Sequence, residues 1–184
     1  MTYDFVRNPF SPPQVTFGDL VDRGEAEIRT GPFGTQLRAS DYVAAGVAVL
    51  NVRNLGYGDI RDEKVEFVEG ETITRLQGHM LRAGDIVFGR KGAVERHAYI
   101  PVADQRWMQG SDCIRLRVLG ANIDSRYLSY SLLTEYHKQW MMAQCSHGST
   151  MASLNQEIVR RILVPLPPLP IQRRHLSRDP PVAH

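Results

Sequence analysis

A loop that carries two adjacent cations between glycines, Gly89-Arg90-Lys91-Gly92, has the composition of an anion-binding site. Glycines let backbone amides approach an anion closely, and the arginine and lysine supply positive charge for phosphate groups. Arg96 and His97 follow within the same stretch. A surface hairpin whose charges are only solvated has the same composition, so both interpretations stay open.

A second polar loop, Gly148-Ser149-Thr150-Met151, lies just before a predicted helix. Its hydroxyl groups are suited to meet a phosphate at the helix N-terminus, where backbone N–H groups have no partner within the helix. An ordinary entry into a helix explains the same residues equally well.

Catalytic motifs are absent from the sequence or incomplete. It contains no G-x-S-x-G, Walker, H-E-x-x-H or G-x-G-x-x-G pattern. Asp179-Pro180-Pro181 matches the start of an amino-methyltransferase motif, but Val182 stands where an aromatic side chain would stack on the target base. Asp62 and Lys64 match a fragment of a nuclease metal site without its Pro-Asp partner, and a solvated charge run explains them better. We therefore expect a protein that is not an enzyme, with no catalytic residue and no metal site.

The two cysteines, Cys113 and Cys145, are too few for a disulfide framework, and neither they nor the six histidines show the spacing of metal ligands. We expect two reduced, buried thiols in a cytoplasmic protein. The first residues show no basic region followed by an apolar stretch, so we expect no secretory signal. No apolar run approaches the roughly 18 to 20 residues that a membrane helix needs, so we expect no membrane among the partners.

Length and charge place limits on the class of protein. The chain has 184 residues, of which 42% are hydrophobic and 23% charged, as in one globular domain rather than a disordered or collagen-like chain. Residues 1–72 hold 7 Lys/Arg and 12 Asp/Glu, whereas residues 73–184 hold 15 and 8. Of the 22 basic residues, 19 are arginine, whose planar fork fits phosphates and guanine edges. The basic second part suits nucleic acid, although genomic base composition also favours arginine over lysine.

The elements that must position these loops are mostly short strands. Apolar and β-branched runs bounded by turn residues predict strands over residues 26–30, 47–52, 84–88, 98–102 and 113–118. In the last of these, strict alternation places Ile114, Leu116 and Val118 on one face and Arg115 and Arg117 on the other.

The helical predictions are fewer. A short helix is expected to start at Phe17, and Ser40-Asp41 is expected to cap another over residues 42–44. Apolar residues recurring every four positions predict one long amphipathic helix over residues 124–145, and Ser153-Leu-Asn-Gln156 reads as a capping box for a further short helix. The fold class is therefore mixed α/β (α+β), a compact domain with a twisted, mostly short-stranded sheet, glycine-rich loops and one long amphipathic helix.

Several motifs occur in a fixed order along the chain: Gly31-Pro-Phe-Gly-Thr-Gln-Leu, Val49-Leu-Asn-Val-Arg-Asn, Gly84-Asp-Ile-Val-Phe-x-Arg-Lys-Gly-Ala, Gln109-Gly-Ser-Asp-Cys, Gly148-Ser-Thr-Met-x-Ser-Leu-Asn and Ile162-Leu-Val-Pro-Leu-Pro-Pro-Leu-Pro-x-Gln-Arg-Arg. Each motif alone is weak, but the series is specific. Over roughly residues 15–174 it resembles the target recognition domain of a Type I restriction–modification specificity subunit.

The resemblance implies a non-catalytic reader of double-stranded DNA. Such subunits recognise a bipartite sequence through two of these domains, direct adenine methylation and restriction by partner subunits, and bind no cofactor themselves. The expected partners are Type I modification (methyltransferase) subunits, which bind S-adenosylmethionine, and a second specificity half-subunit. By this analogy the candidate DNA-facing residues are Asn51, Arg53, Arg90, Lys91, Arg96, Gln109, Ser111, Ser149 and Thr150.

The sequence departs from the family pattern in three places. Glu95 stands where a glycine is expected, and its carboxylate would repel phosphate; Ile171 replaces the usual glutamate. The long spacer helix is also missing, since the chain continues into Pro180-Pro181. We expect residues 1–14 to be an irregular lead-in, residues 15–170 to be the recognition domain, and residues 171–184 to be a weakly ordered short tail that replaces the helix.

Three alternatives stay open, one of them a nuclease or methyltransferase fragment, which needs a metal or S-adenosylmethionine site that the sequence does not reveal. The domain is alternatively an assembly or regulatory module that binds modification or specificity subunits without reading DNA. A truncated remnant without activity is the third alternative.

Overall fold

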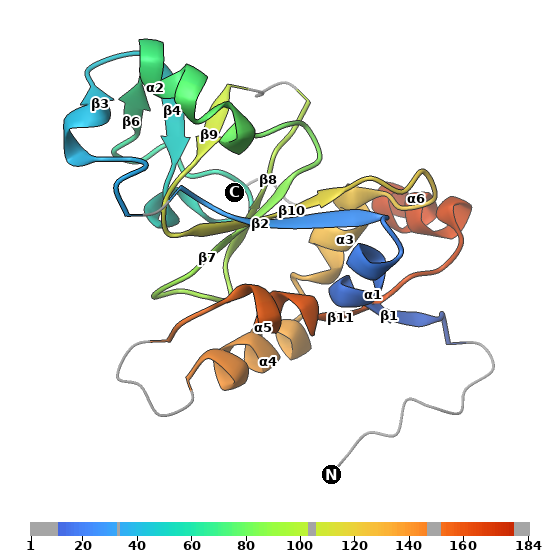
Figure 1. Cartoon of the computed structure of the whole chain (residues 1–184). Coiled ribbons are helices and arrows are strands. Elements are labelled where there is room, and N and C mark those ends of the chain that lie inside the picture. The colour runs from blue at the N-terminus through green and yellow to red at the C-terminus, as the bar shows by residue number, and fades with distance from the viewer. Residues whose placement is uncertain (1–10, 33, 103–105, 147–151, 179–184) are drawn as a thin grey trace.

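The computed structural model describes residues 11–32, 34–102, 106–146 and 152–178 (Figure 1). A five-stranded sheet runs through the middle of the molecule, a four-stranded sheet lies at one end, and most helices cover one side of the larger sheet. A two-stranded ribbon joins the beginning and the end of the described chain. The mixed α/β prediction, with short strands in twisted sheets, is confirmed.

The five-stranded sheet has the order β2-β10-β7-β8-β5. Its strands are β2 (Ala26–Thr30), β10 (Cys113–Val118), β7 (Ile86–Gly89), β8 (His97–Tyr99) and β5 (Tyr57–Gly58). The central strand β10 pairs antiparallel with both neighbours, with Leu116 opposite Ile28 on one side and Ile86 on the other. The strands predicted at 26–30 and 113–118 are observed with the predicted bounds, and the strands predicted at 84–88 and 98–102 are observed with shifted ends.

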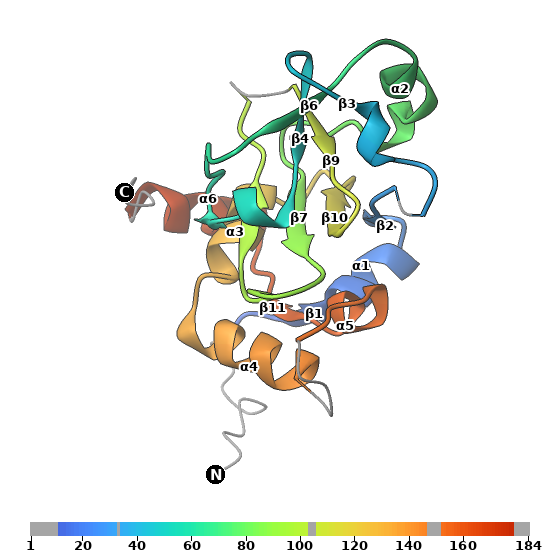
Figure 2. The ribbon, with the colours of Figure 1, turned by 90° about the vertical axis from the view of Figure 1, so that its left-hand side faces the viewer.

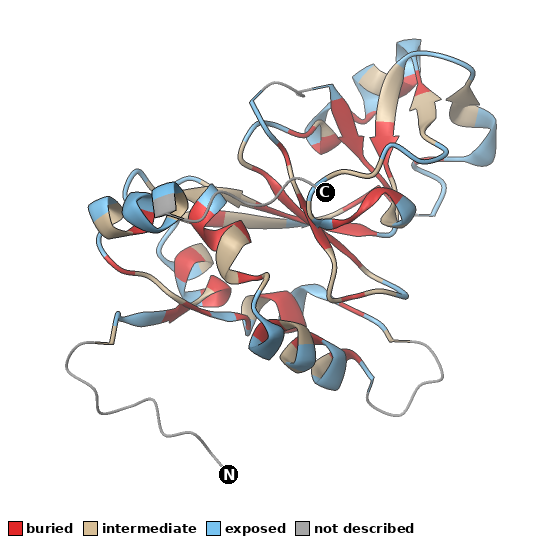
Figure 3. Ribbon diagram, turned by 180° about the vertical axis from the view of Figure 1, so that it is seen from behind, coloured by how far each residue is buried: buried red, intermediate tan, exposed pale blue. Residues whose placement is uncertain are grey.

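Helices cover the apolar face of this sheet. They are α1 (Phe17–Asp22), α3 (Ser125–Ser131), α4 (Glu135–Cys145) and α5 (Gln156–Arg160). Ile114 and Leu116 of β10 lie in one fully buried core with Phe17, Phe88 and Leu128. Figure 3 shows this burial along the central strands and on the helix sides that face them. The short helix predicted to start at Phe17 is therefore confirmed, and its apolar residues anchor it to the sheet.

The four-stranded sheet has the order β3-β6-β4-β9 and lies beyond the opposite face, at the top of Figure 2. Its strands are β3 (Tyr42–Val43), β6 (Glu66–Val68), β4 (Val47–Leu50) and β9 (Trp107–Gln109). The short helices η2 (Ala39–Asp41), η3 (Val52–Asn54), η4 (Gln77–His79) and α2 (Gly70–Arg75) surround it. Val49, Val68 and Met108 form its small core with Leu37 and Leu76.

The second face of β10 is polar, as the alternation predicted, but it is not open to solvent. Arg115 is fully buried beneath η4, where its Nη2 donates to Glu27 Oε1 at 2.6 Å. Arg117 forms a bidentate pair with the buried Asp85, at 2.8 and 2.7 Å. Both guanidinium groups also donate to backbone carbonyls near the four-stranded sheet, Arg115 to Gly78 O and Arg117 to Met80 O. Because both are already paired with carboxylates of the protein, neither is free for an external anion.

The single long helix predicted over residues 124–145 is wrong, because the structure contains two helices, α3 and α4. The Thr134 hydroxyl accepts a hydrogen bond from His137 N at 3.3 Å and so starts a new helix. Threonine favours this N-cap position over a helix interior because its hydroxyl replaces a missing backbone partner. Apolar residues every four positions continue across the break and do not reveal it.

Two smaller helix predictions also fail. Residues 42–43 form strand β3 and not a helix, since the Asp41 carboxylate caps the preceding turn through Arg38 N at 2.7 Å. Ser153 does not cap α5, because its backbone N–H bonds Cys145 O. Asn155 takes that role, and its side chain accepts from Ile158 N at 2.9 Å.

The segment expected to be a weakly ordered tail contains helix α6 (Leu169–Arg178). The buried side chain of Gln172 holds it: Oε1 accepts from Asp124 N at 2.9 Å, and Nε2 donates to Pro167 O at 2.8 Å and Asn122 O at 3.1 Å. Tertiary contacts of this kind stabilise helices that are too short to form alone. At the other end, β1 (Gln14–Thr16) begins inside the expected lead-in and pairs with β11 (Leu163–Pro165).

Candidate nucleic-acid interface

Five connecting segments meet at one edge of the central sheet, where β2 and β7 end and β10 begins. Four backbone hydrogen bonds join them: Gly31 N to Cys113 O (2.8 Å), Gly110 N to Leu50 O (3.0 Å), Arg90 N to Asp112 O (2.8 Å) and Leu154 N to Arg90 O (2.8 Å). The sequence motifs quoted above are largely these segments. The fold therefore gathers into one surface residues that are up to 123 positions apart in the chain, from Gly31 to Leu154. We call this surface the loop edge.

Close approach of backbones explains two of the motif glycines. A Cβ atom at Gly31 would clash with the Gly110 carbonyl oxygen. A Cβ atom at Gly110 would lie 2.6 Å from the Leu50 carbonyl oxygen and 2.5 Å from Asn51 Oδ1. No side chain fits at either position, so these glycines set the spacing of the loop edge rather than contact a ligand.

The Arg90-Lys91 pair lies at the centre of the loop edge. Arg90 is partly exposed, and its backbone N–H and carbonyl are both bonded to neighbouring loops. Lys91 is exposed, with Nζ 3.5 Å from Asp112 Oδ1, and the two side chains are 56% and 50% exposed. An ion pair this exposed contributes about 0–1 kcal/mol and is screened by salt. The backbone of the loop is therefore fixed while the lysine charge stays available to a stronger anion.

Asn51 and Arg53 share one carboxylate. Asn51 Nδ2 donates to Glu66 Oε2 at 2.7 Å, and Arg53 Nη2 lies 3.2 Å from the same oxygen. The Arg53 side chain is 48% exposed, so it faces solvent from η3 although its charge is partly balanced. Glu66 comes from the four-stranded sheet, and sequence reasoning did not place it beside these residues.

The structure separates two of the predicted residues, Gln109 and Ser111, although they lie close in sequence. Gln109 is fully buried, and its Nε2 donates to Arg29 O at 2.9 Å and Cys113 O at 3.0 Å. This burial corrects the prediction that Gln109 faces DNA. Its amide instead connects β9 to β2 and β10 inside the protein by hydrogen bonds. Ser111 is partly exposed in the next turn, on the loop edge. Ser149 and Thr150 lie outside the described residues.

Arg96 lies apart from Arg90 and Lys91, at the far end of the connection between β7 and β8. Its guanidinium carbon is 5.5 Å from the centre of the Tyr57 ring, and its buried Nε has no hydrogen-bond partner. Glu95, the residue that departs from the family pattern, accepts a hydrogen bond from the Tyr57 hydroxyl at 3.1 Å. Its carboxylate is therefore engaged within the protein.

The buried titratable groups are in unreactive forms. Burial lowers the pKa of His97 to about 3 and that of His137 to about 4, so both are neutral near pH 7. Burial raises the pKa of Cys113 to about 12 and that of Cys145 to about 11, which keeps both as thiols. The prediction of two reduced, buried cysteines is confirmed. Within the described ranges, no group of three His, Cys, Asp or Glu residues is arranged to hold a metal.

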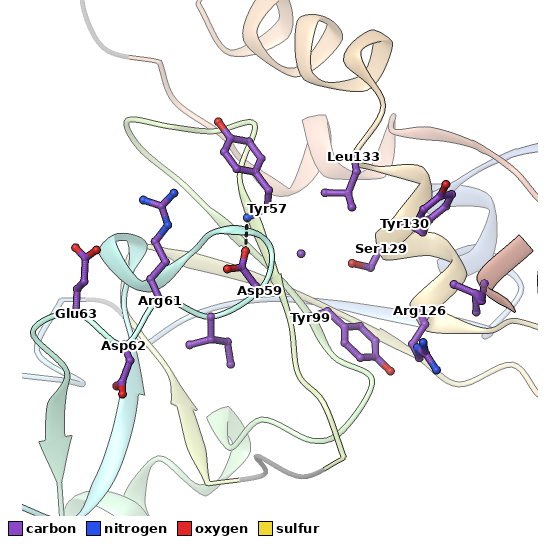
Figure 4. A pocket seen from close by; sticks show the side chains of 13 residues that line it. Tyr57, Asp59, Arg61, Asp62, Glu63, Tyr99, Arg126, Ser129, Tyr130 and Leu133 are labelled. Atoms are coloured by element: carbon purple, nitrogen blue, oxygen red, sulfur yellow. Dashed lines mark hydrogen bonds between the residues drawn. The ribbon is translucent and has the colours of Figure 1, made fainter. Parts of the chain in front are cut away.

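A cavity of about 760 Å³ lies between the 57–63 loop, α3 and α6 (Figure 4). Tyr57, Tyr99 and Ser129 line it together with the acidic residues Asp59, Asp62 and Glu63. Arg61 and Arg126 line it as well, so the wall carries both signs of charge, whereas the loop edge presents adjacent cations. No sequence motif marked it, because its walls come from three distant parts of the chain. In the part of the chain that is described, no helix is long and apolar enough to cross a membrane.

Comparisons with known proteins identify the family. Residues 57–178 match the model of the family described as Type I restriction modification DNA specificity domain. The chain is 24% identical over 149 residues to the Type I restriction enzyme MjaVIII specificity subunit of Methanocaldococcus jannaschii. That match covers 79% of this chain and 35% of the relative, so the chain spans about a third of the relative's length.

Solved structures share the fold. An HsdS subunit from Thermoanaerobacter tengcongensis has a TM-score of 0.62 at 17% identity, covering 96% of this chain and 38% of its own. A Type I restriction–modification S subunit from M. genitalium has a TM-score of 0.61 at 15% identity, covering 90% of this chain and 37% of its own. Since the family model covers most of the chain, this protein belongs to the Type I restriction modification DNA specificity domain family.

Proposed function

We propose that this chain is a non-catalytic recognition domain that binds one short half-site in double-stranded DNA. The observation that carries the proposal is the loop edge, where the motif segments meet around the exposed Lys91 and the partly exposed Arg90. Arg90, Lys91 and Arg53 contact phosphates, while Asn51, Ser111, Ser149 and Thr150 supply polar groups for base edges or sugar–phosphate oxygens. The domain extends from about residue 15 through α6, because Gln172 is part of its buried interior.

The domain acts together with other proteins in this proposal. The family description and the relative's name support assembly with the other subunits of a Type I restriction–modification system. In this proposal those partners methylate adenine and cleave DNA, with S-adenosylmethionine bound on the modification subunit. A bipartite target requires a second recognition domain, and this chain spans only about a third of its curated relative. The complex works in the cytoplasm, where its DNA target lies.

Binding to duplex DNA as a function of salt tests the proposal. Removing one phosphate-binding cation reduces the slope of log K against log salt by about 0.9, so R90A/K91A reduces it by about 1.8 between roughly 50 and 200 mM salt. The double variant R173A/R174A is the matched control, because it removes the same charge from exposed positions on α6. Fluorescence anisotropy with a labelled duplex measures both. Equal slopes for the two double variants contradict the proposal.

A non-reading assembly module is the second candidate. The observation in its favour is that Arg53 and Lys91 already form ion pairs with Glu66 and Asp112. These pairs lower the positive charge that is available to DNA. In that case, modification subunits are retained by the immobilised chain after nuclease treatment, and R90A/K91A leaves this retention unchanged. Retention that disappears with the nuclease removes this candidate.

A further inference from the structure

Two cations from different elements meet at one tyrosine. Lys138 Nζ, from α4, lies 4.7 Å from the centre of the Tyr57 ring, and the Arg96 guanidinium carbon lies 5.5 Å from it. The Tyr57 hydroxyl donates to Glu95 Oε1 at 3.1 Å, which fixes the ring to the end of the β7–β8 connection. We call Tyr57, Arg96 and Lys138 the tyrosine cluster. The negative face of an aromatic ring attracts a cation, which orients the long side chains of Lys138 and Arg96.

Helix α4 runs alongside the connection that carries Arg90, Lys91 and Arg96. At its C-terminal end, Cys145 O accepts from Ser153 N, and Ser153 forms a β-bridge with Lys91. Nearer its N-terminal end, Lys138 meets Arg96 through Tyr57. Figure 2 shows the connection below β7 lying beside the helix. The helix is therefore attached at two points, and one of them is next to the loop edge.

Neither cation of the tyrosine cluster forms an ion pair with a described carboxylate. Among the described residues, Arg53, Lys91, Arg115 and Arg117 each have a carboxylate oxygen within 4.0 Å, whereas Lys138 and Arg96 have none. The nearest acid in sequence, Glu95, is bonded to the tyrosine hydroxyl. Both cations contact one ring without an ion pair, so each keeps its charge available to an anion. Both side chains are partly exposed, so an anion reaches them from solvent.

We propose that the tyrosine cluster is a second phosphate-binding site, which extends the DNA interface from the loop edge onto α4. Lys138 and Arg96 contact the phosphates, and Tyr57 is a positioning residue that holds the two cations together. The seven helical steps from Lys138 to Cys145 span about 10 Å, roughly three base-pair steps of DNA. One strand of a duplex therefore reaches both sites. The inference rests on the proposed function, because it assigns further contacts to the same DNA.

Lysine footprinting tests this directly, since the chain contains only three lysines: Lys64, Lys91 and Lys138. Acetylation by an amine-reactive ester is measured at each lysine by mass spectrometry, with and without saturating duplex DNA at low salt. We expect severalfold slower modification of Lys91 and Lys138 in the presence of DNA. Lys64 is exposed beside Asp62 and Glu63, where phosphate is repelled, so its modification rate is expected to stay the same.

Variants separate the role of the tyrosine ring from that of its hydroxyl. K138A is expected to lower the slope of log K against log salt by about 0.9, and K64A to leave the slope unchanged. Y57L removes the ring, so Lys138 is no longer protected while Lys91 keeps its protection. Y57F keeps the ring and preserves the protection of both. Thermal unfolding of each variant shows whether it is folded, and K138A provides the test should Y57L not fold.

The outcomes distinguish this inference from the proposed function. Protection of Lys91 without protection of Lys138 overturns the second site and leaves the loop edge as the DNA interface. Protection of neither lysine, or no DNA binding by the chain, overturns both. Protection of Lys138 that persists in Y57L removes the positioning role of the tyrosine.

Discussion

At the scale of single residues, the structure divides the motif residues into those that face solvent and those that shape the loops. Lys91 and Arg53 are exposed with weak internal ion pairs, whereas Gln109 is entirely internal. Gly31 and Gly110 have no room for a side chain. Membership of a sequence motif therefore does not distinguish residues that shape the loops from residues that are exposed and free to contact a ligand.

Gly31 provides a sharp test of this structural role. In G31A the new methyl group meets the Gly110 backbone carbonyl, and overpacking against rigid backbone costs about 1–3 kcal/mol of unfolding free energy. Urea denaturation measures the change. G120A is the matched control: its methyl group lies 3.2 Å from the nearest atoms, Glu25 Cβ and Ile123 Cδ1, so a few tenths of an ångström of movement accommodates it. If G31A is as stable as G120A, the close approach of the two loops is wrong.

The sequence predicted the cationic loop because its chemistry lies within four consecutive residues. It did not predict the partners of those charges. Glu66 lies 15 positions from Asn51, and Lys138 lies 81 positions from Tyr57, so only the folded chain brings them together. Gln109 was misassigned for a related reason, since a glutamine in a polar motif gives no sign of whether the fold buries it.

At the scale of elements, strands were predicted better than helix boundaries. The alternation of β10 is explicit in Ile114, Arg115 and Leu116, and the strand is observed with the predicted bounds. The break between α3 and α4 depends on one cap at Thr134, which the apolar periodicity does not register. Helix α6 was missed because its stability comes from Gln172 and not from its own composition.

Removing the Gln172 amide therefore loosens α6 as an element. Q172A leaves Asp124 N, Asn122 O and Pro167 O without this partner, and buried unpaired groups cost about 1–3 kcal/mol each. We expect faster tryptic cleavage after Arg173 and Arg174 under native conditions. Q139A on α4 is the control, because its exposed amide makes only a bond to Glu135 within the same helix. Unchanged cleavage in Q172A would mean that other contacts hold α6.

At the scale of the whole molecule, stability is expected to depend on pH through the buried histidines. The pKa of His97 is about 3 and that of His137 about 4 in the folded protein, against 6.5 ordinarily. Below about pH 6.5 these histidines therefore become protonated in the unfolded chain while they stay neutral in the native state. The free energy of unfolding decreases as the pH falls. Above that pH both states have neutral histidines, and this contribution is constant.

The slope gives the expected size of the effect. Between about pH 6 and 5, each histidine contributes up to about 1.4 kcal/mol of unfolding free energy per pH unit. Urea denaturation across this range measures it, above the range in which ordinary carboxylates titrate. H137Q is expected to flatten the dependence, whereas Q139A, at an exposed and non-titrating position on the same helix, is expected to leave it unchanged. A flat profile for the unmodified protein contradicts the burial of neutral histidines.

The pairing of β1 with β11 places Val15 directly opposite Val164. The first strand of the folded unit thus lies beside the strand that leads into α6, its last described helix, and the chain between these two strands folds as one unit. A unit that includes both paired strands and α6 keeps its contacts when it is moved as a whole between longer proteins. For a domain that reads a target sequence, this geometry favours the evolution of new specificities by recombination of the entire module. The pairing of β2 with β10, by contrast, makes a cut within the module disruptive, because strands on either side of it would be left without their partners.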